Sequence, residues 1–183
     1  MSITMQKTLF TLWLFATLLS LSNCKKDPPS TPEFPEGRWG YATAKRNGED
    51  WKATCKSFFD KENPGHWRIG LAVHLDNYYF LGGVEFTNVP AAIGNHTVTK
   101  SVLWEYEGVR AHYGLSDADV SLGDYHVLNG AEPNFFTVDS YDSVSREIKG
   151  RFELTMLVSR RPDPSAPDTV RFMQGTYHTR LDL

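Results

Sequence analysis

Apolar and polar side chains alternate with a period of two over most of the chain from Trp39 onward. Between Ile148 and Val158 the even positions carry apolar residues or glycine, whereas most of the odd positions are polar. The segment from His66 to His74 alternates in the opposite phase. Because successive side chains of a strand point to opposite faces of a sheet, this pattern predicts strands with one buried face.

Turn residues predict how the first strands are connected. Asn47-Gly48 lies between segments 41–46 and 51–58 and is typical of a tight β-hairpin, with a loop of either two or four residues. In both cases the small and apolar residues of one face are Ala42, Ala44, Trp51, Ala53 and Cys55. The last segment changes phase between Phe172 and Tyr177, which predicts a β-bulge near Gln174-Gly175.

The remaining strand patterns set the fold class. One strand is expected after a turn at Asp76-Asn77, and its expected inner face is Tyr78, Phe80, Val84 and Phe86. Weaker strand patterns lie at 96–99, 102–106, 109–113, 125–128 and 135–140. The Pro-bearing segment 159–168 predicts a long loop, and 116–122 could hold one turn of helix. The sequence therefore predicts an all-β, antiparallel domain over residues 39–183 with nine or ten strands, either a β-sandwich or a flattened β-barrel.

The first 23 residues have the pattern of an export signal. Lys7 is the only charged residue before position 24, and the apolar run from Leu9 to Leu21 follows it. Thirteen helical residues span about 20 Å, less than the roughly 30 Å hydrocarbon core of a bilayer. We therefore expect residues 1–23 to be a cleaved signal peptide rather than a membrane anchor.

The end of that segment resembles a lipid-attachment site. Leu21-Ser22-Asn23-Cys24 is similar to the lipobox of bacterial lipoproteins. The resemblance implies acyl chains such as palmitate on Cys24, and two or three chains anchor a protein stably to a membrane. Residues 24–38 hold four prolines, and this lipidated tether could place the domain up to roughly 40 Å from the bilayer. We expect a cell-envelope location, on either leaflet of the outer membrane.

Charge and cysteine content narrow the classes of partner. Without Lys7, 18 basic residues stand against 22 acidic residues, which gives the mature chain a net charge of −4. This balance disfavours nucleic acid as a partner. Because Cys24 is the lipid-attachment residue, Cys55 has no cysteine left to pair with, so the fold must depend on its apolar core.

Several elements resemble a known family. The hairpin YATAKRNGEDWKA at 41–53 is similar to the opening of a family of Bacteroidota lipoprotein domains of unknown function. The segments 84–98, 141–156 and 172–181 resemble later strands of the same family. The resemblance implies an all-β envelope lipoprotein and implies no particular chemistry.

The search for catalytic motifs is negative. The sequence contains no Gly-x-Ser-x-Gly elbow, no His-Glu-x-x-His pair, no phosphate-binding glycine loop and no dinucleotide fingerprint. The acidic segment 117–124 lacks the glycine and the final acidic residue of a calcium loop. His66 could meet His112, His126 or His178 across strands, but we interpret the histidines as polar-face residues. We therefore expect no enzyme, no metal and no cofactor.

Two kinds of residue remain as candidate sites. Trp104, Tyr106 and Tyr113 are the candidate ligand-facing aromatics, with core packing as the alternative. Ser143 and Thr169 lie in Asp-Ser-Val and Asp-Thr-Val sequences that resemble the O-glycosylation motif of Bacteroidota.

These features lead to two functional hypotheses, with an enzyme of unrecognised type as a third and less favoured alternative. The first is a monomeric, non-catalytic binding module that recognises a glycan, a peptide or an envelope protein near the membrane. The second is a carrier that holds a small apolar ligand inside a lipocalin-like barrel. The second hypothesis needs a cavity lined by the expected inward set of Trp67, Ile69, Leu71, Phe80, Phe152 and Leu154.

Overall fold

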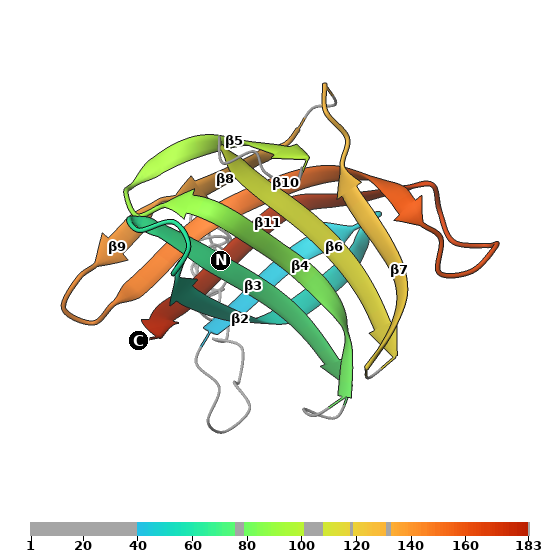
Figure 1. Ribbon diagram of the computed structural model, residues 1–183, viewed down its shortest axis with the longest axis horizontal. Coiled ribbons are helices and arrows are strands. Elements are labelled where there is room, and N and C mark those ends of the chain that lie inside the picture. Colours follow the sequence, from blue (N-terminus) through green and yellow to red (C-terminus); the bar gives the residue numbers. More distant parts are fainter. Residues whose placement is uncertain (1–39, 76–78, 101–107, 118, 131–132, 183) are drawn as a thin grey trace, which may run out of the picture. The chain divides into compact units, whose positions relative to one another are not determined.

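The computed structural model describes residues 40–75, 79–100, 108–117, 119–130 and 133–182. These residues form eleven strands and no helix (Figure 1). The strands are β1 (Gly40–Arg46), β2 (Glu49–Phe59), β3 (His66–Leu75), β4 (Tyr79–Pro90), β5 (Gly94–Lys100), β6 (Val109–Asp117), β7 (Val120–Val127), β8 (Phe135–Val138), β9 (Ser140–Asp142), β10 (Glu147–Arg160) and β11 (Thr169–Asp182). With no helix there, the described residues contain no helical segment that could span a membrane.

All eleven strands belong to one sheet whose pairings close into a ring. Going round the ring, the strands are β1, β2, β3, β4, β6, β7, β10 and β11, and β11 pairs again with β1. Strands β5 and β8 form a second connection between β6 and β10, and β9 pairs with β10. The predicted all-β fold is confirmed. The sheet is mixed rather than antiparallel, because β11 pairs with β2 and β5 pairs with β6 in parallel.

The strand number differs from the sequence prediction for a local reason. The expected strand at 135–140 is interrupted at Asp139, so it forms the end-to-end pair β8 and β9. Both strands pair with β10. The pattern at 102–106 lies outside the described residues.

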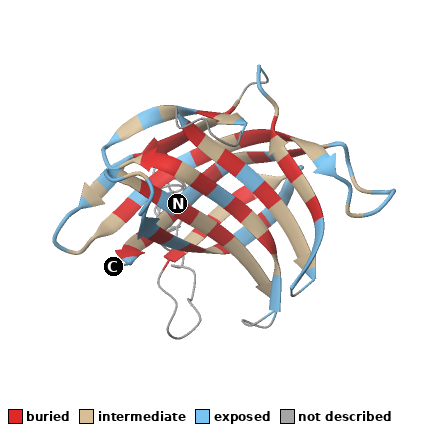
Figure 2. Ribbon diagram, viewed as in Figure 1, coloured by how far each residue is buried: buried red, intermediate tan, exposed pale blue. Residues whose placement is uncertain are grey.

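The core follows the period-two pattern, and buried residues alternate with exposed ones along the strands (Figure 2). In β10, Ile148, Phe152 and Leu154 are fully buried. Aromatic rings fill the space between strands: the ring centroids of Phe86 and Phe136 lie 4.4 Å apart, and Phe136 stacks on Tyr177 at 4.9 Å. Truncating one such phenylalanine to alanine costs about 3–5 kcal/mol.

Both predicted turn features are present. Arg46 pairs with Glu49, so the hairpin has a two-residue loop, and Asn47 and Gly48 have φ of 53° and 92° as a type I′ turn requires. The β-bulge also lies where the change of phase predicted it. Phe152 pairs with Gly175 and Leu154 with Phe172, while Gln174 has φ of 54°.

Two local predictions are wrong. Phe80 is 37% exposed and faces outward, whereas Val84 and Phe86 face inward as expected. The register between β3 and β4 shifts beside His74, which pairs with Phe80, so the alternation does not continue through the shift. Segment 116–122 forms no helical turn, because its ends belong to β6 and β7 and its described residues pair across a hairpin. Tyr78 lies outside the described residues.

Candidate functional site

Only some of the sequence-predicted site residues lie within the described ranges. Cys24, Trp104 and Tyr106 lie outside them, so their roles remain predictions. Tyr113 lies in β6 with 2% of its surface exposed, and its ring packs against Phe172 at a centroid distance of 5.2 Å. Tyr113 is therefore part of the core, and it also lines a cavity at one end of the ring.

The two candidate O-glycosylation residues have different surroundings. Ser143 is exposed in the turn between β9 and β10. The preceding carboxylate of Asp142 accepts a hydrogen bond from the Val144 amide at 2.8 Å, which stabilises the turn. Thr169 is partly exposed at the start of β11, opposite Leu157 of β10. Both hydroxyl residues thus lie at the border of a loop and a strand.

The described histidines and Cys55 lie in different surroundings. No set of three histidine, cysteine or acidic residues within metal-binding reach exists among the described residues. His112 and His126 lie opposite each other on β6 and β7, and His112 Nε2 is 3.2 Å from Asp124 Oδ1. Cys55 is fully buried, and burial raises the pKa of its thiol to about 12, so it packs as a small apolar residue.

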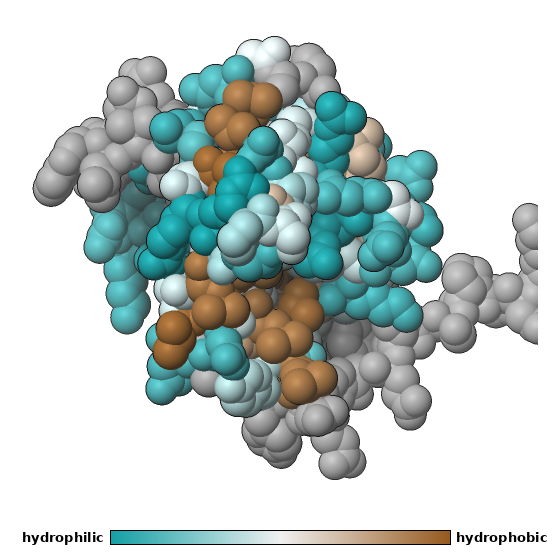
Figure 3. Space-filling model, turned by 90° about the vertical axis from the view of Figure 1, so that its right-hand side faces the viewer, coloured by the Kyte–Doolittle hydropathy of each residue, from teal (hydrophilic) through white to brown (hydrophobic). Residues whose placement is uncertain are grey.

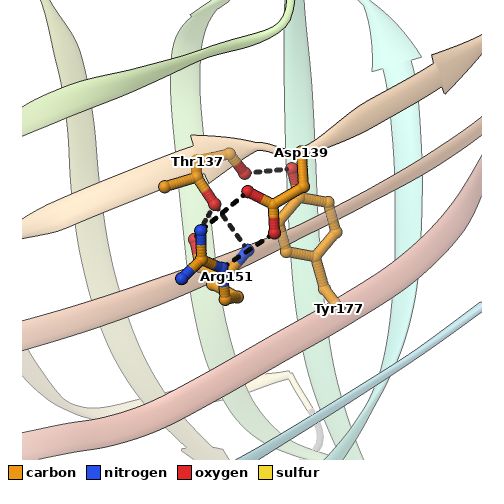
Figure 4. Close-up of polar contacts among 4 residues, drawn as sticks. All are labelled: Thr137, Asp139, Arg151 and Tyr177. Atoms are coloured by element: carbon orange, nitrogen blue, oxygen red, sulfur yellow. Dashed lines mark hydrogen bonds and ion pairs between the residues drawn. The ribbon is translucent and has the colours of Figure 1, made fainter.

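Thr137, Asp139, Arg151 and Tyr177 form a polar cluster on the sheet (Figure 4). The Arg151 guanidinium donates two hydrogen bonds to the Asp139 carboxylate at 2.8 and 3.0 Å. The Thr137 hydroxyl accepts from the Arg151 amide at 2.9 Å, and the Tyr177 hydroxyl donates to the Thr137 carbonyl at 2.8 Å. The cluster uses both carboxylate oxygens and links β8, β10 and β11, so we interpret it as a contact between strands rather than a binding site.

A groove on the outer face of the sheet is the best candidate site. It has a volume of about 510 Å³ and lies across strands β2, β3, β4, β6 and β7. We call it the outer groove. Its lining residues include Thr54, Lys56, Phe58, Gly70, Ala72, Phe80, Gly83, Glu85, His112, Gly114 and Asp124. Its size is within the range of small-molecule and oligomer sites.

The floor of the outer groove is a row of residues from neighbouring strands, and the three in its middle, Ala72, Gly83 and Gly114, are small. Thr54 pairs with Ala72, Ala72 with Gly83, Gly83 with Gly114, and Gly114 with Asp124. Strands are spaced by about 4.8 Å, so this row of five residues crosses about 19 Å of the sheet. Small residues on the three middle strands, between Thr54 and Asp124 at the ends, make a trench where a sheet face would otherwise carry large side chains.

A parallel row forms one wall of the trench. Lys56, Gly70, Glu85 and His112 follow one another in register across β2, β3, β4 and β6. The opposite side carries Phe80. The groove therefore combines a cation, a carboxylate and an imidazole with apolar surface.

The charged groups of the outer groove are held in fixed positions. Arg68 donates to Glu85 at 2.8 Å, and Arg160 lies 2.8 Å from the second carboxylate oxygen of Asp124. These pairs are partly exposed, so each adds little to stability. Their effect is to orient two carboxylates as hydrogen-bond acceptors.

A second hollow continues the groove. It has a volume of about 310 Å³, and it shares Glu85 and His112 with the outer groove. Arg68, Thr87 and Arg110 also line it, so this part is more polar. A ligand longer than the first groove could extend into it.

Gly70 is the most informative residue of the outer groove. A β-carbon built there would have no atom within 4 Å, and the backbone φ is outside the left-handed region that favours glycine. Neither crowding nor backbone conformation therefore requires glycine in the middle of β3. Glycine in a strand interior costs about 0.5–1 kcal/mol relative to alanine and often marks the close approach of a ligand.

Gly83 and Gly114 differ from Gly70 in this respect. A β-carbon at Gly83 would lie 2.1 Å from the Leu71 carbonyl oxygen, so the packing of β3 against β4 requires glycine there. A β-carbon at Gly114 would lie 3.3 Å from the His112 ring, which is a tight contact. Only Gly70 of these three lacks a structural reason.

Sequence reasoning missed the outer groove because its residues are distant in sequence. Gly83 and Gly114 become neighbours only through the pairing of β4 with β6, which skips β5. The one local signal was Gly70 within an otherwise regular strand pattern. The chain matches no family model, no curated protein and no solved structure.

Proposed function

We propose that the protein is a non-catalytic module that binds a linear oligosaccharide in the outer groove. The observation that carries this proposal is the groove across five strands, which contains Gly70, a glycine that neither crowding nor backbone conformation requires. A trench of about 19 Å suits a chain of several sugar rings. The second hollow offers further polar contacts for the same chain.

The side chains of the groove match the two kinds of surface that a sugar presents. Phe58 and Phe80 are 44% and 37% exposed and can stack on the apolar faces of sugar rings. Glu85 and Asp124 supply oriented acceptors for hydroxyl groups, and Lys56 supplies a donor. Both signs of charge are present, so a strongly charged polymer is a poorer match than a neutral one.

A peptide is a less suitable ligand for this groove. Peptides that bind sheets usually add a strand to a free edge and pair with its backbone. The outer groove lies on a sheet face, where the backbone groups of β2, β3, β4, β6 and β7 are already paired with neighbouring strands. Recognition there depends on side chains, which suits hydroxyl-rich ligands.

The cellular setting of this proposal rests on the sequence. We propose that residues 1–23 are an export signal and that acyl chains on Cys24 anchor the domain to the outer membrane through the tether of residues 24–38. The motif Leu21-Ser22-Asn23-Cys24 supports this. Replacing Cys24 with alanine is expected to release the protein from membranes and abolish labelling by a radioactive fatty acid. Continued membrane attachment of that variant would contradict the anchor.

The binding proposal is tested on an array of linear neutral and acidic oligosaccharides of increasing length. We expect retention of neutral chains, with affinity that rises with length until the groove is filled. Phe58→Ala should weaken binding about tenfold, because it removes a stacking surface worth about 1.4 kcal/mol. Phe59→Ala is the matched control, since Phe59 is 48% exposed on the same strand but does not line the groove.

Three results would count against this function. Equal loss of binding in both variants would indicate a general effect on β2 rather than stacking. Retention of peptides but not of glycans would show that the ligand is a peptide rather than an oligosaccharide. Shortened glycan products after incubation would contradict the non-catalytic assignment.

A further inference from the structure

A third hollow lies at one end of the ring and shares Ser116 with the outer groove. It has a volume of about 600 Å³. The hairpin turn of β1 and β2, the inner faces of β4, β6 and β7, and the β10–β11 loop line it. We call it the mouth cavity. Its lining residues include Arg46, Glu49, Tyr113, Leu115, Leu122, Tyr125 and Asp163.

Its polar centre is a pair of side chains from β1 and β6. Arg46 is partly buried, and its Nη1 donates a hydrogen bond to the Tyr113 hydroxyl at 2.9 Å. Among the described residues Arg46 forms no ion pair within 4 Å, and the Tyr113 hydroxyl proton has no acceptor. A guanidinium has five N–H donors, so this pair leaves several donors free.

These free donors form an arrangement suited to a carboxylate. A planar guanidinium can bind both oxygens of a carboxylate at once, and the Tyr113 hydroxyl can donate to one of them. Burial raises the pKa of Tyr113, so its hydroxyl stays protonated and able to donate at neutral pH. Buried charges in proteins are usually paired, so an anion would complete the pairing of this partly buried cation.

The rest of the mouth cavity is mostly apolar or aromatic. The rings of Tyr113 and Tyr125 lie 5.6 Å apart, and Leu81, Leu115 and Val170 continue the surface. Leu122 is 43% exposed at the rim. Figure 3 views this end of the molecule and shows apolar side chains gathered on it. An apolar body of a ligand would be buried here, at about 25 cal/mol for each Å² of apolar surface.

The rim limits the charge of the ligand. Glu49 and Asp163 line the cavity and are exposed. Glu49 lies directly opposite Arg46 in the hairpin, so these acids repel a multiply charged group such as a phosphate more strongly than a single carboxylate. We propose that the mouth cavity binds a small monocarboxylate with an apolar alkyl or aromatic body.

The described residues at the centre of the ring are packed together. Five of the six residues expected to line a central cavity, namely Trp67, Ile69, Leu71, Phe152 and Leu154, are at most 1% exposed and belong to one packed cluster. The sixth, Phe80, faces outward. A ligand in the middle would have to displace these side chains, whereas the mouth cavity is accessible without rearrangement.

The test is calorimetric titration of the full protein with decanoate, and with decanol as the uncharged analogue. We expect decanoate to bind more tightly than decanol. Arg46→Gln should weaken decanoate binding about tenfold or more, because a hydrogen bond between two charged groups is lost. The affinity for decanol should stay nearly unchanged. Arg171→Gln is the matched control, since Arg171 is exposed on β11 and does not line the cavity.

A second variant guards against loss of folding. Leu122→Asp places a carboxylate on an exposed rim position, so it should leave the unfolding midpoint unchanged. The new carboxylate should weaken decanoate binding by charge repulsion. Equal binding of decanoate to the wild type, Arg46→Gln and Leu122→Asp would overturn the proposal. So would the absence of decanoate binding, or tighter binding of decyl phosphate than of decanoate. None of these results depends on the outer groove.

Discussion

The substitution Gly70→Ala tests the reasoning about the outer groove through stability and binding together. The new methyl group would have no atom within 4 Å, and the backbone conformation accepts any residue. Alanine should therefore reduce the conformational freedom of the unfolded chain without strain in the folded state. We expect a gain of about 0.5–1 kcal/mol in the free energy of unfolding.

The same substitution should weaken binding of the oligosaccharide. The methyl group fills part of the groove between Lys56 and Glu85, the two neighbours of Gly70 in register. A stabilised protein with reduced affinity for oligosaccharides is the expected combination. It is the opposite of what a glycine with a structural role would give.

Gly83→Ala is the matched control on the adjacent strand. Its β-carbon would lie 2.1 Å from the Leu71 carbonyl oxygen, so β3 and β4 would have to separate. Overpacking of this kind costs about 1–3 kcal/mol. The two glycine variants should therefore change stability in opposite directions.

Urea unfolding followed by tryptophan fluorescence measures the change in stability of both glycine variants, because Trp51 and Trp67 are buried, at 5% and 1% exposure. A gain of about 0.5–1 kcal/mol in a domain of this size raises the melting temperature by about 1–4 °C. If Gly70→Ala lowered stability by as much as Gly83→Ala, Gly70 would have a structural role and the reasoning would fail.

Three further predictions concern groups outside both cavities. Cys55 should resist alkylation by iodoacetamide at pH 8 in the folded protein and react on unfolding, since burial raises its thiol pKa to about 12; rapid labelling of the native protein would contradict its burial. Asp139→Asn should cost less than about 1 kcal/mol in urea unfolding, because the Arg151–Asp139 pair is exposed; a much larger loss would show that the ion pair holds β8 in place. Burial lowers the pKa of His96 and of His126, so the folded state favours their neutral forms. Stability should be full above about pH 6.5 and fall as the pH drops through the unfolded and then the folded pKa values. Replacing both histidines with glutamine should flatten this dependence in melting experiments, and an unchanged slope would assign it to other groups.

The sequence was sufficient for features that depend on local pattern. Alternation predicted the inner faces of β3 and β10, because the apolar residues of each strand lie on its buried face. Asn47-Gly48 gave the hairpin, because only a type I′ turn suits both residues there. The change of phase in β11 gave the bulge at Gln174.

The sites depend on pairing that local pattern does not contain. Arg46 and Tyr113 are 67 positions apart, and only the closed ring brings them within hydrogen-bond distance. The glycine row of the outer groove likewise requires the register of β3, β4 and β6. Phe80 was misplaced because a register shift beside His74 reversed the face that alternation assigned to it.

The most direct test of the central claim is an NMR titration of the isotope-labelled protein with the best-retained oligosaccharide of the array. Backbone amide signals report where a ligand lies on a sheet. The proposed function predicts the largest shifts at Gly70, Gly83 and Gly114, and small shifts at Thr43 and Thr176 on the β1–β11 side of the sheet. Saturable shifts centred anywhere else on the protein, or none at these glycines, would contradict binding in the outer groove.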